Sequence, residues 1–274
     1  MSEPSAFLEA LGRRRAQFAL PTQAQLRASA FADQALALLF PHFATSDGPG
    51  DPAAELAALE RTLHGLLTAF GCGGAQAAAC TRTLLDQLPA LHEQVLRDAD
   101  AIWRADPAAT SVDEVMLAYP GFFATACHRL AHRLHGLQVP LLPRMIAAHA
   151  QRQSGIDIHP GAVIGESFAI DHGIGIVIGA TTIVGDRVRI YQGVTLGAMS
   201  VEKSLAHVKR HPTIEHDVTI YANATILGGD TVVGRGSIVG GNVWLTKSVP
   251  PRSVVTHRPA ELRVGDEGTL EFHI

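Results

Sequence analysis

The second half of the chain repeats with a period of six residues. Branched aliphatic residues return at this spacing in four runs, several of them followed by glycine, at Ile158, Ile164 and Ile170; at Ile178, Val184, Ile190 and Leu196; at Ile214, Ile220 and Ile226; and at Val233, Val239 and Leu245. A return at every sixth residue fits neither the helical period nor the simple strand period. It is typical of a parallel β-helix, in which each coil is a triangle of short strands with the aliphatic side chains inside.

The first half has a different pattern, in which Ala- and Leu-rich segments alternate with Gly, Pro and capping residues. It predicts helices near residues 23–40, 52–70, 75–88, 90–104, 112–118, 122–135 and 141–151. Ser111 and Glu114 have the spacing of a capping box. We therefore expect an α + β chain with an N-terminal helical domain (1–154), a β-helix of hexapeptide repeats (155–255) and a C-terminal tail (256–274) that is weakly ordered unless a partner holds it.

Two irregularities interrupt the count of six. The first is a two-residue slip within residues 171–176. The second is residues 198–213, which lack the aliphatic and glycine pattern and predict an extruded loop that carries Lys209, Arg210 and His211. Insertions in a solenoid are frequent places for a functional site, so we expect the chemistry there.

Composition narrows the classes of function. The 274 residues are 47% hydrophobic and 18% charged, with a net charge of -4, and the only basic run is Arg13-Arg14-Arg15. This balance argues against a nucleic-acid-binding or polybasic membrane surface. There is no apolar stretch of membrane-spanning length and the N-terminus lacks the features of a signal peptide, so we expect a cytoplasmic protein. Three cysteines without a CxxC pair predict buried, reduced thiols.

Asp157 and His172 are the first candidates for catalysis. They lie fifteen residues apart on successive early coils, an offset that could bring a carboxylate beside an imidazole. Such a pair suits general-base catalysis, because the imidazole titrates near neutral pH and the carboxylate fixes its tautomer. The spacing alone equally allows Asp157 and Asp171 to cap turns while His172 lies on a solvated corner.

Other candidate residues have ordinary explanations beside the functional one. Arg210-His211 could hold a small carboxylate or belong to a solvated loop that Pro212 returns to the coil. Asp106-Pro107 reads as a helix N-cap with Pro at the first position. A zinc site from His159, His172, His207, His211 or His216 is conceivable, but no metal-ligand spacing repeats. No GxGxxG helix start and no P-loop occur.

Several segments together closely resemble the bacterial and plant serine O-acetyltransferases. They are Gly155-Ile-Asp-Ile-His-Pro, Ile170-Asp-His-Gly-Ile-Gly, Gly193-Val-Thr-Leu-Gly197, Arg210-His-Pro and Val249-Pro-Pro251, with Arg104-Ala-Asp-Pro-Ala108 and Tyr119-Pro-Gly-Phe-Phe upstream. The resemblance implies a left-handed β-helix and transfer of an acetyl group from acetyl-CoA to the hydroxyl of L-serine, giving O-acetylserine for cysteine synthesis.

The resemblance also implies a role for each matching residue. His172 would be the general base and Asp157 its orienting partner. Arg210 and His211 would hold the substrate carboxylate, and Asp106 and Asp171 its amino group. Backbone amides around Gly197, Ala198, Ala222 and Gly241 would line the pantetheine arm of acetyl-CoA, with Lys247 and Arg258 as guesses for the CoA phosphates. No metal is expected.

The partners implied by the resemblance are copies of the same chain and one other enzyme. The family builds its active site between subunits of a homotrimer and pairs trimers into hexamers through the helical domain. The C-terminal Ile274 suggests binding to O-acetylserine sulfhydrylase, and L-cysteine is expected as a feedback inhibitor. Residues 197–210 lack the family's Gly-Gly-Thr-Gly-Lys run, which leaves the CoA contacts and the response to inhibitor open.

Three competing readings remain at this point. The acceptor could be a sugar or another small alcohol, although Asp106, Arg210 and His211 favour an amino acid. A zinc-dependent carbonic anhydrase on the same coil is an alternative of another class. A purely structural β-helix would leave Asp157 and His172 without a task.

Overall fold

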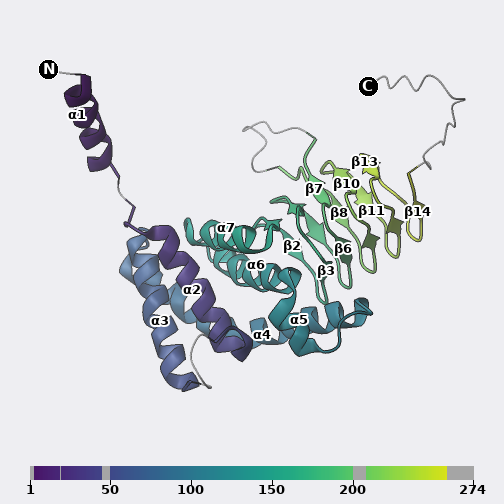
Figure 1. Ribbon diagram of the computed structural model, residues 1–274, viewed down its shortest axis with the longest axis horizontal. Helices are drawn as coiled ribbons and strands as arrows, with labels where there is room; N and C mark the ends of the chain where they lie inside the picture. The colour runs from purple at the N-terminus through teal and green to yellow at the C-terminus, as the bar shows by residue number, and fades with distance from the viewer. Residues whose placement is uncertain (1–2, 19, 45–49, 200–207, 258–274) are drawn as a thin grey trace, which may run out of the picture.

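A helical part and a β-helix lie end to end in the molecule (Figure 1). The computed structural model describes residues 3–18, 20–44, 50–199 and 208–257. The fold is the expected combination of N-terminal helices and a parallel β-helix. Residues 200–207 of the predicted loop and 258–274 of the predicted tail, including Arg258 and Ile274, lie outside the described residues.

The helices agree with the sequence pattern except at two places. They are α1 (Glu3–Ala16), α2 (Ala24–Leu39), the short 3-10 helix η1 (Pro41–Phe43), α3 (Pro52–Ala69), α4 (Gly74–Ala105), α5 (Val112–Ala118), α6 (Pro120–Gly136) and α7 (Leu142–Ser154). The pattern did not predict α1. The predicted break before residue 90 is wrong, because α4 continues through Pro89. Buried Leu84, Leu88 and Leu91 pack on both sides of that proline and offset its lost hydrogen bond.

The predicted cap of α5 is present in part. Ser111 Oγ accepts a hydrogen bond from the Glu114 amide at 3.0 Å, which satisfies one of the amides at the helix start. The Glu114 carboxylate turns back toward the same end of the helix and accepts from the Thr110 amide at 2.6 Å. The helix therefore begins where predicted.

The described strands form three parallel sheets. Sheet A holds β1 (Asp157–Ile158), β4 (Val177–Ile178), β7 (Thr195–Gly197), β10 (Thr225–Leu227) and β13 (Trp244–Leu245). Sheet B holds β2 (Val163–Ile164), β5 (Ile183–Val184), β8 (Thr213–Ile214) and β11 (Val232–Val233). Sheet C holds β3 (Ala169–Asp171), β6 (Arg189–Tyr191), β9 (Thr219–Ile220), β12 (Ile238–Val239) and β14 (Val254–Val255). Each strand pairs with the strands one coil away. Every aliphatic residue of the hexad count is buried except Leu245, which is partly buried against the same core.

The two-residue slip widens one corner of the β-helix. Five residues separate β3 from β4 (172–176), whereas three separate β6 from β7 (192–194). His172 and Gly173 take left-handed conformations there, with φ of 57° and 96°. A Cβ on Gly173 would overlap the side chains of Ile156 and Ile170, so glycine is required. The slip therefore places His172 on a corner that bulges outward.

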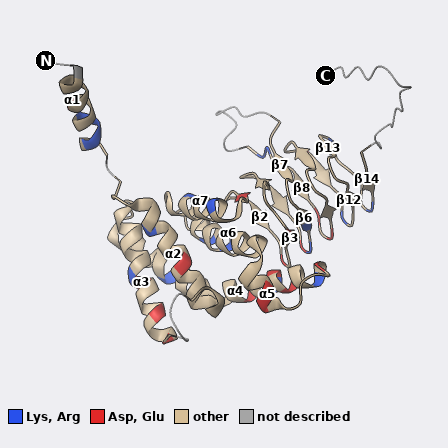
Figure 2. Cartoon of the chain, in the orientation of Figure 1, with Lys and Arg blue, Asp and Glu red and all other residues tan. Residues whose placement is uncertain are grey.

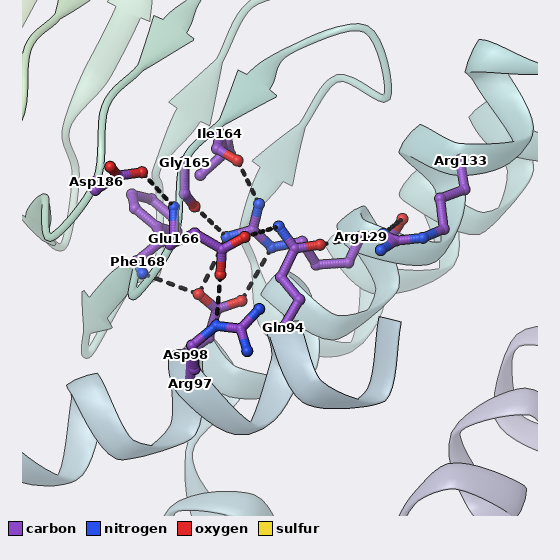
Figure 3. Close-up of polar contacts among 10 residues, drawn as sticks. All are labelled: Gln94, Arg97, Asp98, Arg129, Arg133, Ile164, Gly165, Glu166, Phe168 and Asp186. Atoms are coloured by element: carbon purple, nitrogen blue, oxygen red, sulfur yellow. Dashed lines mark hydrogen bonds and ion pairs between the residues drawn. The ribbon is translucent and has the colours of Figure 1, made fainter. Parts of the chain in front are cut away.

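A buried ion pair joins the helices to the first coil (Figure 3). Arg129 of α6 donates to both oxygens of Asp98 on α4, at 2.9 and 3.0 Å, and to the carbonyl oxygens of Ile164 and Gly165, at 2.5 and 2.6 Å. Asp98 also accepts from the Phe168 amide at 2.9 Å. Because the pair contacts α4, α6 and the turn before β3, it determines where the end of α4 lies relative to the β-helix.

Candidate functional site

Asp106, Asp171 and His172 line one cleft between the helical part and the β-helix. The cleft has a volume of about 390 Å³, and Tyr119, Pro120 and Ile174 contribute to its walls. Asp106 follows the last residue of α4, Asp171 ends β3 and His172 opens the widened corner. Figure 2 shows acidic residues gathered around α5, beside this end of the β-helix. The structure therefore brings Asp106 together with the adjacent pair Asp171 and His172, which lies far from it in the sequence.

Asp106 is held by two hydrogen bonds. Its Oδ2 accepts from the Tyr119 hydroxyl at 2.7 Å, and its Oδ1 accepts from the Ala108 amide at 2.8 Å. These bonds, that from Tyr119 first, lower the pKa of Asp106, and the same bond raises the pKa of Tyr119 to about 12. The sequence reading of Asp106 as a helix N-cap is wrong, because residues 107 and 108 form a turn and no helix begins there.

The carboxylate nearest to the His172 imidazole is that of Asp171. Asp171 Oδ1 lies 3.6 Å from His172 Nε2, which is too long for a hydrogen bond, while Oδ2 binds Arg189 at 2.5 Å. The His172 side chain is 75% exposed and that of Asp171 is 13% exposed. The imidazole is thus open to a reactant, next to a carboxylate held in place by an arginine that the sequence reasoning missed.

Asp157 lies at the same corner as His172, one coil apart. The Gly175 amide donates to the Gly155 carbonyl at 2.9 Å across this corner, and Asp157 begins the adjacent β1. Within the described residues no hydrogen bond or ion pair joins Asp157 to His172. The orienting role of Asp157 therefore remains a prediction.

Arg210 and His211 lie at a different corner, where the chain enters β8. The His211 ring is buried, with 7% of the residue exposed, over Gly179, where a Cβ would overlap it. Its Nδ1 accepts from the Thr181 amide at 3.1 Å and contacts the Thr181 hydroxyl at 2.9 Å. That hydroxyl in turn accepts from the amides of Arg210 and His211, at 3.0 and 3.1 Å.

This network determines the chemistry of His211. Because Nδ1 accepts from the Thr181 amide, the neutral ring carries its proton on Nε2. Burial, aided by the charges of Arg210 and Lys209, lowers the pKa of His211 to about 4. His211 is therefore a neutral hydrogen-bond donor at neutral pH, beside the guanidinium of Arg210. Thr181 was not singled out from the sequence; its place one coil from His211 follows only from the strand register.

The two groups of residues lie at opposite edges of sheet A. His172 lies at the corner that leads from sheet C to sheet A, which we call the C–A corner (172–176, 192–194, 221–224 and 240–243). Arg210 and His211 lie at the A–B corner, between sheets A and B (159–162, 179–182, 198–199, 208–212 and 228–231). A single chain therefore does not place His172 beside its own Arg210 and His211.

Comparison with known proteins identifies the family. No family model matches the chain. It is 52% identical over 185 residues to the plasmid serine acetyltransferase of Synechococcus elongatus, covering 66% of this chain and 58% of that protein. It is 42% identical over 167 residues to the serine acetyltransferase of Bacillus pumilus, covering 61% of this chain and 75% of that protein.

Solved structures agree with the sequence comparison. Serine acetyltransferase isoform 3 of Entamoeba histolytica, in complex with cysteine, matches with a TM-score of 0.78 and 33% identity, over 86% of this chain and 84% of that chain. The serine acetyltransferase of Vibrio cholerae matches with a TM-score of 0.62 and 30% identity, over 88% and 92% of the two chains. This chain belongs to the serine acetyltransferase family. Alignments span 58%, 52% and 50% of the full length of the first three curated relatives.

The residues assigned to acetyl-CoA by likeness to serine acetyltransferases divide between the same two corners. Ala222 and Gly241 belong to the C–A corner, where the Asn242 amide donates to the Ala222 carbonyl at 2.9 Å. Gly197 ends β7 and Ala198 follows it at the A–B corner. Lys247 lies after β13, near the open end of the β-helix. Both edges of sheet A therefore carry one part of the expected CoA contacts.

The histidines considered for zinc do not gather. His159 and His211 lie at the A–B corner, His172 at the C–A corner and His216 between β8 and β9, while His207 is outside the described residues. Within the described ranges, no three His, Cys, Asp or Glu side chains come close enough together to hold a metal ion.

Every helix in the described part of the chain is too short or too polar to cross a membrane.

Proposed function

We propose that this protein is a serine O-acetyltransferase, which transfers the acetyl group of acetyl-CoA to the hydroxyl of L-serine and releases O-acetyl-L-serine and CoA for L-cysteine biosynthesis in the cytoplasm. The observation that carries this proposal is the cleft in which Asp106 and Asp171 flank the exposed imidazole of His172. Two carboxylates suit the ammonium group of an amino acid, and an exposed imidazole suits its hydroxyl. Solved relatives include a serine acetyltransferase of Neisseria gonorrhoeae in complex with serine.

The reaction needs two proton transfers, one from the serine hydroxyl to His172 and one from His172 to the CoA thiolate. His172 removes the proton of the serine hydroxyl as the oxygen attacks the carbonyl carbon of the thioester, and Asp157 orients the imidazole. The carbon–sulfur bond then breaks, and the CoA thiolate takes the proton from the imidazolium. Arg210 supplies a positive charge and His211 an Nε2–H donor for the serine carboxylate.

Assembly completes the site. Three chains with sheet A turned toward a common axis bring the C–A corner of one chain beside the A–B corner of the next. One chain then supplies His172 and the two carboxylates for the substrate ammonium, Asp106 and Asp171. Its neighbour supplies Arg210, His211 and half of the CoA contacts. We therefore propose an obligate homotrimer, with pairing of trimers through the helical part.

The remaining partners rest on family likeness. The cysteine complexes of the Entamoeba histolytica relatives support L-cysteine as an inhibitor at the serine site. Binding of Ile274 to O-acetylserine sulfhydrylase concerns residues outside those described, and deletion of Ile274 would test it; unchanged affinity for the sulfhydrylase would count against it.

A thiol-release assay tests the proposed activity. Acetyl-CoA is supplied with L-serine, L-homoserine or a panel of sugars, and free CoA is measured. L-Serine should give a larger kcat/KM than any sugar, because only an amino acid uses both the carboxylate pair and the Arg210–His211 pair. A sugar preferred over L-serine would replace the proposed acceptor.

A further inference from the structure

Arg189 lies on the outer face of sheet C, one coil from the serine-binding carboxylate Asp171. Its strand β6 pairs with β3, so that Ala169 lies opposite Arg189 and Asp171 opposite Tyr191. Alternation along the strand places the side chains of Arg189 and Tyr191 on the same face. The guanidinium carbon lies 4.7 Å from the centre of the Tyr191 ring, and the terminal nitrogen binds Asp171 Oδ2 at 2.5 Å.

These contacts divide the two oxygens of Asp171. Oδ2 is taken by Arg189, which leaves Oδ1 toward His172 and the cleft. Arg189 also lines a crevice together with Asp106, Tyr119 and Asp171. A side chain fixed by stacking on Tyr191 therefore holds one rotamer of the carboxylate that faces the substrate ammonium.

The geometry around Arg189 is not optimised for stability. Its Nε is a buried nitrogen without a hydrogen-bond partner among the described residues, and a buried donor in that state is destabilising. Such a group is more readily explained by a task at the neighbouring site than by a contribution to folding.

The balance of charges around Asp171 indicates what Arg189 does at the site. Asp106 and Asp171 carry two negative charges against one substrate ammonium, and the guanidinium of Arg189 supplies the second positive charge. The positive charge of Arg189 also adds a small part to the lowering of the Asp106 pKa, behind the hydrogen bonds from Tyr119 and Ala108. Without Arg189, the Asp171 carboxylate would be left to pair with a protonated His172.

We propose that Arg189 is a positioning residue for acceptor binding, which acts through Asp171 to hold Oδ1 toward the substrate amine and to keep Asp171 from trapping His172 as an imidazolium. The inference rests on the proposed function. The charged and titratable residues that line the cleft with His172 are Asp171 on β3, Asp106 after α4 and Tyr119 before α6. Arg189 on β6 contacts Asp171, and Asp157 begins the adjacent β1.

Three variants of the full chain test this role. Arg189→Met removes the charge and the hydrogen bond, and Arg189→Lys keeps the charge without the planar guanidinium. Arg187→Met is the matched control, because Arg187 pairs with Asp217 at 2.6 Å on the neighbouring corner and, within the described part of the chain, forms no hydrogen bond or ion pair with the proposed site residues. Oligomeric state and unfolding midpoint are measured for each.

Kinetics should separate positioning from packing. For Arg189→Met we expect the KM for L-serine to rise about tenfold or more, with the KM for acetyl-CoA unchanged within about twofold. The acid limb of the kcat profile should move up by about half a pH unit or more, because an uncompensated Asp171 favours the imidazolium. Arg189→Lys should recover part of both effects, and Arg187→Met should resemble the wild type.

The outcomes distinguish this inference from the proposed function. An assembled Arg189→Met with an unchanged serine KM and an unchanged acid limb overturns the role of Arg189. If Arg189→Met does not assemble, the same two readouts on Arg189→Lys decide. Calorimetric titration with L-serine decides when the wild type has no acetyltransferase activity. A wild type that binds L-serine but does not acetylate it refutes the proposed function. In that case, equal affinity of the wild type and Arg189→Met for L-serine overturns the inference. A wild type that binds no L-serine overturns both.

Discussion

The hydroxyl of Tyr119 donates to Asp106 Oδ2 at 2.7 Å and thereby links the start of α6 to the residue that follows α4. Removing this bond in Tyr119→Phe leaves Asp106 with the Ala108 amide alone and lets its pKa rise toward the ordinary value. We expect the KM for L-serine to rise about three- to tenfold, with little change in the KM for acetyl-CoA. Steady-state kinetics at varied serine measures this, and an unchanged serine KM would argue against a substrate role for Asp106.

Substitution by valine should affect stability differently at the neighbouring residues Thr181 and Thr182. The Thr181 hydroxyl serves two amides and the His211 ring, whereas the Thr182 hydroxyl is buried without a partner among the described residues. Thr181→Val should lower the free energy of unfolding by about 1–3 kcal/mol and weaken serine binding. Thr182→Val should leave stability unchanged or increase it. Urea unfolding of both variants checks the pair, with Thr181→Ser as the control that keeps the hydroxyl.

Stability should fall with acidification between about pH 6.5 and pH 4. Burial lowers the pKa of His211 and of His159 from 6.5 to about 4. In the unfolded chain these rings bind protons at a higher pH than in the folded protein, so the unfolded state is favoured as pH falls through this window. Each ring accounts for up to about 3 kcal/mol. Urea midpoints across pH should flatten in His211→Gln; an equally steep profile in that variant would exclude His211 as a contributor.

Mixed oligomers test whether the site is shared between chains. His172→Ala and His211→Ala should each be nearly inactive alone. In a trimer that contains both variants, only one of the three sites receives His172 from one chain and His211 from its neighbour, so about a third of the wild-type activity should return. Co-expression with two affinity tags isolates the mixed species. If no activity returns, each site belongs to a single chain.

The Asp98–Arg129 pair should be required for the junction between the two parts. Both side chains are almost completely buried, with exposures of 0% and 4%. Removing one partner leaves the other charged and buried, so Arg129→Met and Asp98→Leu should each destabilise the protein by about 3–5 kcal/mol. The double variant should be less destabilised than the sum of the two, which chemical denaturation measures. Additive losses would show that the two side chains are not coupled.

Much of the fold could be predicted from the sequence, because the interior of a β-helix accepts only apolar side chains at fixed intervals. The hexad residues form the core, and the slip at 171–176 does place His172 on a widened corner. The helix that spans Pro89 could not be predicted, because its continuation depends on tertiary burial of Leu84, Leu88 and Leu91. The same holds for Asp106, whose local pattern suggested a helix cap.

The sequence by itself determined the repeat, its interruptions and the family motifs, since these depend on the chemical type of each residue and on spacing along the chain. Only the tertiary structure decided which polar groups meet. Asp106 lines the same cleft as Asp171 because the buried Arg129 sets the position of α4 on the first coil. Arg189 reaches Asp171 through the pairing of β6 with β3, and Thr181 reaches His211 across one coil. The last two contacts join residues 18 and 30 positions apart in the sequence, and they are fixed by strand register rather than by any local pattern.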